Sequence, residues 1–154
     1  EDAEYGDDHD YLVSLFPSLG LNSAWIGGDE SEGGFTDLYL ETFGTFYVTS
    51  IAQVTRPDGL LVFASAHGTD PESPLGNEVV DGYFRVTSPS FTSERWDEQY
   101  DPATPGQHGF VSARHGDGAT TAFVDGHVET LTIQQLRDMR YWANGATRFD
   151  WVLE

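Results

Sequence analysis

The sequence predicts an α+β domain with an antiparallel sheet of about four strands, long irregular loops and a short C-terminal helix. Short β-prone runs separated by Gly, Pro and Asp recur along the 154 residues. Near the C-terminus a hairpin signal is followed at once by a helix-start signal. The length suits one domain over residues 1–154, and 38% hydrophobic and 14% aromatic residues are enough to build its core.

Residues 1–10 form an acidic lead-in, and residues 11–28 are expected to be a buried loop because Pro, Gly and Asn interrupt any helical period. Residues 35–43 favour a helix, and the β-prone run 45–51 follows it. A Pro-Asp-Gly turn then leads into residues 60–66, a continuous apolar run. Such a run predicts a central strand.

The middle of the chain alternates predicted strands with one long loop. Residues 79–88 alternate loosely and favour a strand, and residues 109–113 favour another. Between them, residues 89–109 form a connection of unusual length. Loops this long tend to be functional or to be ordered by a ligand.

A β-hairpin is the firmest local prediction. The β-prone runs 119–124 and 127–131 flank Asp125-Gly126, a dipeptide that favours a two-residue hairpin loop in which both positions adopt positive φ. In that arrangement Val124 pairs with His127.

A helix is predicted directly after the hairpin. Thr132 and Gln135 have the spacing of a capping box, and the helix should continue to about Ala143, before Asn144-Gly145 stops it. The apolar run near the C-terminus, within residues 146–154, favours a final strand.

Charge and composition exclude several classes of partner. The chain has 26 Asp and Glu against 7 basic residues, all of them Arg, and a formal net charge of −19. A surface of this sign repels phosphate groups, so we expect no nucleic-acid partner and no direct docking on anionic lipid. Cys is absent, which excludes disulfides and thiolate metal sites, and no apolar run is long enough to span a membrane.

His115 is followed by nine residues and then by Asp125-Gly126, within RHGDGATTAFVDGHVETLT. This arrangement resembles the H-X9-DG signature of prepilin-type, type II secretion pseudopilin-like proteins. The resemblance covers most of the chain, because it extends to the segments 20–29, 53–66, 82–89 and 136–144. It implies a pilin-like head domain whose hydrophobic N-terminal helix is not among these residues. In such proteins the sheet packs on that helix, so the head alone should expose an apolar face.

The resemblance also implies a function. It indicates a non-enzymatic, extracytoplasmic structural subunit of a filament or of a type II secretion-type assembly. The expected partners are other copies of the chain or other pilin-like subunits, and the membrane would be reached only through the N-terminal helix. The acidic start, EDAEYGDDHD, leads us to expect that a segment precedes it.

His115, Asp125 and Gly126 are expected to act as a structural motif. A buried His115 imidazole would need a hydrogen-bond partner, such as Asp125 or a nearby backbone carbonyl. The alternative is a catalytic metal site, because His and Asp are good zinc ligands, built from His115, Asp117, Asp125 and His127. The spacing does not match a helix-borne His pair, and no nucleophile elbow is present, so we expect no catalytic residues.

Calcium is the one cofactor that the resemblance suggests, because major pseudopilin heads bind it in a loop between late strands. The equivalent region here is 93–107, which offers carboxylates close together in the sequence at Asp97, Glu98 and Asp101. Calcium accepts such irregular oxygen-rich loops. The alternative is a solvated acidic loop held in place by Trp96 and Tyr100.

A second function from a different class is a secreted carbohydrate-binding or hydrolytic domain that uses the 89–109 loop. Its basis is the aromatic and acidic content of that loop. The four tryptophans could line a glycan surface, but we expect them to be core or interface anchors: Trp25, Trp96, Trp142 and Trp151.

Overall fold

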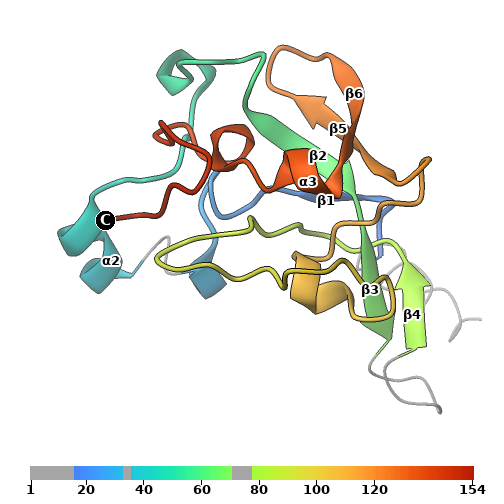
Figure 1. The fold of residues 1–154 in the computed structure, drawn as a ribbon. Coiled ribbons are helices and arrows are strands. Elements are labelled where there is room, and N and C mark those ends of the chain that lie inside the picture. Colours follow the sequence, from blue (N-terminus) through green and yellow to red (C-terminus); the bar gives the residue numbers. More distant parts are fainter. Residues whose placement is uncertain (1–15, 33–35, 71–77) are drawn as a thin grey trace, which may run out of the picture.

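The computed structural model describes residues 16–32, 36–70 and 78–154, and it confirms the predicted α+β class (Figure 1). An antiparallel sheet of order β1-β2-β5-β6 is built from Leu19–Leu21, Leu61–Ser65, Gly118–Phe123 and Val128–Thr132. A two-stranded sheet pairs β3 (His67–Asp70) with β4 (Glu78–Asp81). The helices are α2 (Asp37–Phe43) and α3 (Ile133–Leu136), with 3-10 turns at Glu30–Glu32, Ile51–Gln53, Pro105–His108 and Met139–Tyr141. The predicted acidic lead-in lies outside the described residues.

The central strand predicted over residues 60–66 is confirmed. β2 lies between β1 and β5, and only Ala66 separates it from β3. One nearly continuous extended segment therefore runs from the larger sheet into the smaller one, as Figure 1 shows. Its backbone ties the two sheets together.

Three other strand predictions are wrong or only partly right. The run 45–51 is a loop, because Val48 bonds to the distant residues Trp25 and Gly27 as an isolated bridge, and the chain then enters a 3-10 helix capped by Ser50 and Gln53. The run 79–88 is a strand only to Asp81, where the chain turns. The run 109–113 is not a strand, since Gly109 and Phe110 adopt left-handed φ values of 60° and 63°. The helix predicted over 35–43 is confirmed as α2.

The β5–β6 hairpin is confirmed, but its loop differs from the prediction. The Phe123 amide donates to the His127 carbonyl (3.1 Å) and the Gly126 amide donates to the Phe123 carbonyl (2.9 Å). Phe123, not Val124, therefore faces His127 across a three-residue loop. Only Gly126 of the Asp-Gly pair has positive φ, 91°, which fits a type I turn followed by a left-handed glycine.

The C-terminal region begins as predicted and then departs. Thr132 and Gln135 form the expected capping box, but α3 ends at Leu136. The Asp138 carboxylate accepts a hydrogen bond from the Arg140 amide and starts a separate 3-10 turn, so the helix does not reach Ala143. The predicted final strand is also wrong, because residues 146–154 run as an irregular segment.

The core covers one face of the larger sheet. Trp25, Trp96 and Trp142 are almost fully buried, and the Trp151 ring lies 5.6 Å from that of Trp25. The expectation that the tryptophans are core anchors is thus confirmed. Within the described ranges, no helix has the length and apolar character needed to cross a bilayer.

Candidate functional site

One row of side chains crosses all four strands of the larger sheet. The strand register pairs Leu21 with Phe63, Phe63 with Ala122, and Ala122 with Val128. Residues paired in this way lie on the same face of a sheet. Phe63 is 39% exposed and Val128 is 62% exposed, whereas Ala64, the next residue along β2, is fully buried. The row therefore occupies the face opposite the core, and we call it the open face.

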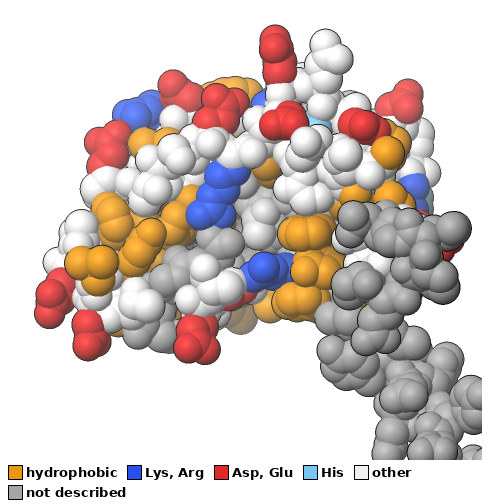
Figure 2. All heavy atoms as spheres, turned by 90° about the horizontal axis from the view of Figure 1, so that it is seen from below, with side chains coloured by type: hydrophobic (Ala, Val, Ile, Leu, Met, Phe, Trp, Pro, Cys, Tyr) orange, Lys and Arg blue, Asp and Glu red, His pale blue; other side chains and the backbone are white. Residues whose placement is uncertain are grey.

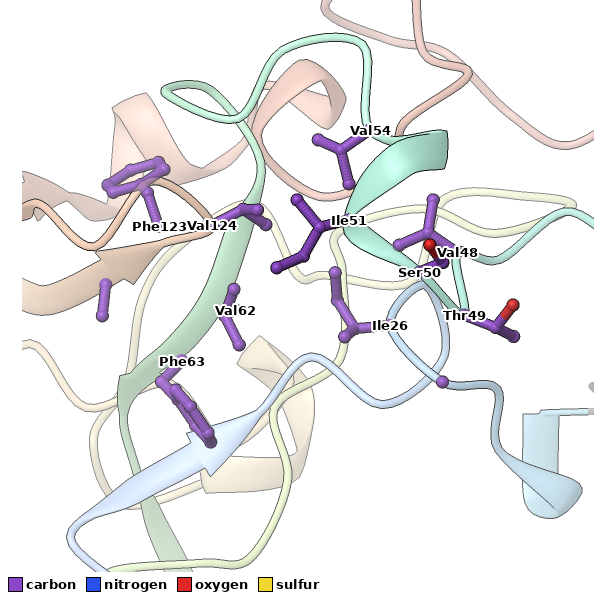
Figure 3. A pocket seen from close by; sticks show the side chains of 12 residues that line it. Ile26, Val48, Thr49, Ser50, Ile51, Val54, Val62, Phe63, Phe123 and Val124 are labelled. Atoms are coloured by element: carbon purple, nitrogen blue, oxygen red, sulfur yellow. The ribbon is translucent and has the colours of Figure 1, made fainter.

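A hollow of about 540 Å³ lies beside this row. Figure 3 shows Ile26 and Ile51 extending from the loops on one side toward Val62 and Val124 on the other. None of its twelve lining residues is charged, although the chain carries a net charge of −19. An apolar hollow of this size on so acidic a chain is a candidate contact surface.

The H-X9-DG residues build the hairpin without the expected buried histidine. The His115 side chain is exposed. Backbone hydrogen bonds between His115 and Gly118 (3.0 and 3.3 Å) close a separate turn just before β5. The Asp125 carboxylate lies 2.6 Å from Nδ1 of His127 and accepts from its amide at 3.0 Å. The expectation that a buried His115 imidazole bonds to Asp125 or to a backbone carbonyl of the hairpin turn is therefore wrong, because the side chain is exposed.

His127, and not His115, is the histidine whose imidazole contacts Asp125 in the hairpin turn. Its hydrogen bond to Asp125 is the largest cause that raises the pKa of the imidazole, and the same contacts lower the pKa of Asp125. The imidazole also stacks on the Phe123 ring at 4.3 Å. Both polar side chains are about a third exposed, so this pair shapes the turn at the surface.

Of the candidate zinc ligands the structure brings Asp125 and His127 into contact, but no larger set. In the described part of the chain, no group of three or more His, Asp or Glu side chains is placed to hold a metal ion. The side chains of Asp97, Glu98 and Asp101 are all exposed. Calcium binding by these residues stays a prediction, and no pre-formed cage supports it.

Arg137 holds this loop instead. Its guanidinium donates to the carbonyl oxygens of Asp97 and Glu98. Trp96 is buried beneath the loop, and the Tyr100 hydroxyl accepts a hydrogen bond from the Ala113 amide (3.1 Å). These contacts fit the alternative in which aromatic residues fix an otherwise solvated acidic loop.

The aromatic residues of the 89–109 loop face the core. Phe91 and Trp96 are buried and Tyr100 is half-buried. A stacking surface for a glycan is therefore not formed by this loop. An exposed aromatic ring lies just outside it, at Phe84, which packs with half-buried Tyr83. The sequence did not indicate it because the run 79–88 looked like one regular strand.

Two buried histidines also went unnoticed in the sequence. His67 and His108 are 4% and 0% exposed, and both rings pack against Tyr100. Neither ring nitrogen of His108 makes a hydrogen bond of normal geometry, although the Asp97 backbone lies close by. Burial is the largest cause that lowers the pKa of both histidines, and it is reinforced by Arg114 near His67 and Arg137 near His108.

Comparison of the chain with protein-family models, with curated proteins and with solved structures finds no match.

Proposed function

We propose that this chain is the head of a non-enzymatic, extracytoplasmic structural subunit, similar to pilins and pseudopilins, in a filament or a type II secretion-type assembly. The observation that supports the proposal is the open face, where an uncharged hollow adjoins exposed Phe63 and Val128. Exposed apolar surface is costly in water unless a partner covers it.

The H-X9-DG hairpin contributes directly to this face. It supplies β5 and β6, and with them Ala122 and Val128, two of the four positions in the row. Strands lie about 4.8 Å apart, so the row is roughly 14 Å wide. An α-helix about 10 Å in diameter would cover most of it. The motif therefore builds part of the surface that the proposed assembly needs.

Site-specific cross-linking tests the proposal. Residues 1–154 contain no Cys, so Phe63→Cys and Val128→Cys each introduce a single thiol into this domain; any Cys elsewhere in the full-length protein is replaced by Ser. A benzophenone maleimide on that thiol should cross-link, in envelope fractions of the native host, to a hydrophobic helix of the same chain or to a neighbouring pilin-like subunit. Mass spectrometry of the adduct identifies which of them it is.

Leu38→Cys is the matched control, because Leu38 is 70% exposed on α2 and does not belong to the row. We expect cross-links at positions 63 and 128 at several times the Leu38 level. Equal labelling at all three positions would count against the proposal. So would a full-length chain without a hydrophobic helix before the head.

A further inference from the structure

A second hollow, of about 510 Å³, lies beside β1, on the side away from β2. Its lining mixes charged, polar and aromatic side chains: Asp29, Glu30, Ser31, Phe84 and Arg85. Backbone hydrogen bonds join Leu21 to Phe84 and Val86 (3.0 and 2.9 Å). The segment that carries Phe84 and Arg85 is thus held against the sheet, and the hollow rests on rigid backbone.

The polar wall of this hollow is pre-organised. The Asp29 carboxylate accepts hydrogen bonds from the Ser23 hydroxyl (2.5 Å) and from the amide and hydroxyl of Ser31 (2.9 and 2.6 Å). Arg85 Nη1 lies 3.4 Å from the same carboxylate and also donates to the Ser31 hydroxyl. Burial alone would raise the pKa of Asp29, but these hydrogen bonds and Arg85 outweigh it, so the pKa is lowered.

One donor in this wall has no partner in the described residues. Arg85 Nε is buried and makes no hydrogen bond there. A buried unsatisfied donor is costly. The Arg85 guanidinium therefore has donor capacity that its contacts with Asp29 and Ser31 do not use.

The apolar wall of the hollow is the Phe84 ring, which packs against Tyr83. Phe84 is 41% exposed, and its ring stands 4.6 Å from Tyr83, which in turn stacks on Phe110 at 4.1 Å. Phe110 has φ of 63°, a conformation that is rare and costly for an aromatic residue. The Arg85 guanidinium lies 5.5 Å from the Phe84 ring centre, where the two walls meet.

We propose that this hollow binds a neutral saccharide. The C–H face of a sugar ring would lie on Phe84, while its hydroxyl groups would exchange hydrogen bonds with Asp29, Ser31 and Arg85. Sites for small ligands commonly combine an apolar wall with a few fixed polar groups in this way. Negative side chains lie along the left and upper edges of the face seen in Figure 2, and the net charge of −19 disfavours acidic sugars. This activity is independent of the proposed structural role.

Binding of defined oligosaccharides tests the proposal. Calorimetric titration of the full chain with maltohexaose, cellohexaose, chitohexaose and mannohexaose should reveal binding to at least one. Phe84→Ala should weaken that binding about tenfold or more, because it removes the stacking wall. Phe149→Ala is the matched control, since Phe149 is 49% exposed and does not line this hollow.

A second variant protects the test against misfolding. Ser31 is exposed, so Ser31→Ala should lower the melting temperature by only a few degrees and still weaken binding several-fold. Amide chemical shifts of residues 29–31 and 84–85 should move during the titration in the unaltered protein. Absence of binding to all four sugars would overturn the proposal. Binding that survives both Phe84→Ala and Ser31→Ala would overturn it as well.

Discussion

Substitution of Gly126 isolates the free-energy cost of positive φ in one turn, because it adds no steric overlap. It closes the β5–β6 hairpin with φ of 91°, and a Cβ added there would meet no atom within 4 Å. Gly126→Ala therefore adds no steric overlap. The expected cost is that of holding an L-residue at positive φ, about 1–2 kcal/mol.

Gly109 supplies the contrasting case. Its φ is 60°, but a Cβ there would lie 2.0 Å from the Thr87 carbonyl oxygen and 2.7 Å from Nε1 of Trp96. Neither neighbour can retreat easily, because the Thr87 amide donates to the Gly109 carbonyl and Trp96 Nε1 donates to Thr87. The backbone cost and the overlap together should exceed about 3 kcal/mol for Gly109→Ala.

Urea denaturation of the two variants separates these effects. In a chain of this size, 1 kcal/mol corresponds to roughly 2–4 °C in melting temperature. We therefore expect thermal melts to show a fall in melting temperature of about 2–8 °C for Gly126→Ala and a larger fall for Gly109→Ala. The m-values of urea unfolding should stay unchanged. Equal losses in the two variants would refute the reasoning, because the close approach to Thr87 would then have no energetic consequence.

Three further measurements probe the core, the buried histidines and the acidic loop. Asn22→Ala should lower the free energy of unfolding by about 2–4 kcal/mol in urea, since its buried amide donates to the carbonyls of residues 61 and 142 (both 2.9 Å). Because burial lowers the folded-state pKa of His67 and His108, the unfolded chain binds protons first. The free energy of unfolding should therefore be full above about pH 6.5 and decline as the pH falls below it. Urea midpoints measured against pH should decline less steeply for His108→Leu than for the unaltered protein. Arg137→Ala should speed proteolysis within 93–107, and melting curves with calcium and with chelator test whether an ion orders that loop.

Local signals explain what could be predicted from the sequence. The Asp-Gly turn and the Thr132–Gln135 capping box depend on residues within four positions of one another, and both formed. Even so, the hairpin loop gained a third residue, since only Gly126 adopts positive φ. The dipeptide specifies that the chain turns, whereas the register of the strands decides which residues pair.

The failures have tertiary causes. Residues 45–51 and 109–113 are rich in β-formers, but backbone bonds from distant segments hold them as loops, with one isolated bridge each at Val48 and Val111. The open face could not be predicted from the sequence either. A register shift between Leu61 and Phe63 places these two residues on opposite faces, although alternation predicts the same face for both. Without that bulge Phe63 would point into the core.

The two proposed surfaces meet on one strand, and this makes their independence testable. A parallel bridge pairs Leu21 with Arg85, so the row that crosses the open face continues from Phe63 through Leu21 to the saccharide hollow. At about 4.8 Å per strand, Arg85 lies roughly 10 Å from Phe63. A helix of about 10 Å diameter centred on the row, between Phe63 and Ala122, would stop short of Arg85. Both surfaces can then be occupied at once. Phe84→Ala should leave cross-linking from position 63 unchanged, and Phe63→Ala should leave saccharide affinity unchanged. Loss of both properties in either variant would mean that the two regions form a single surface.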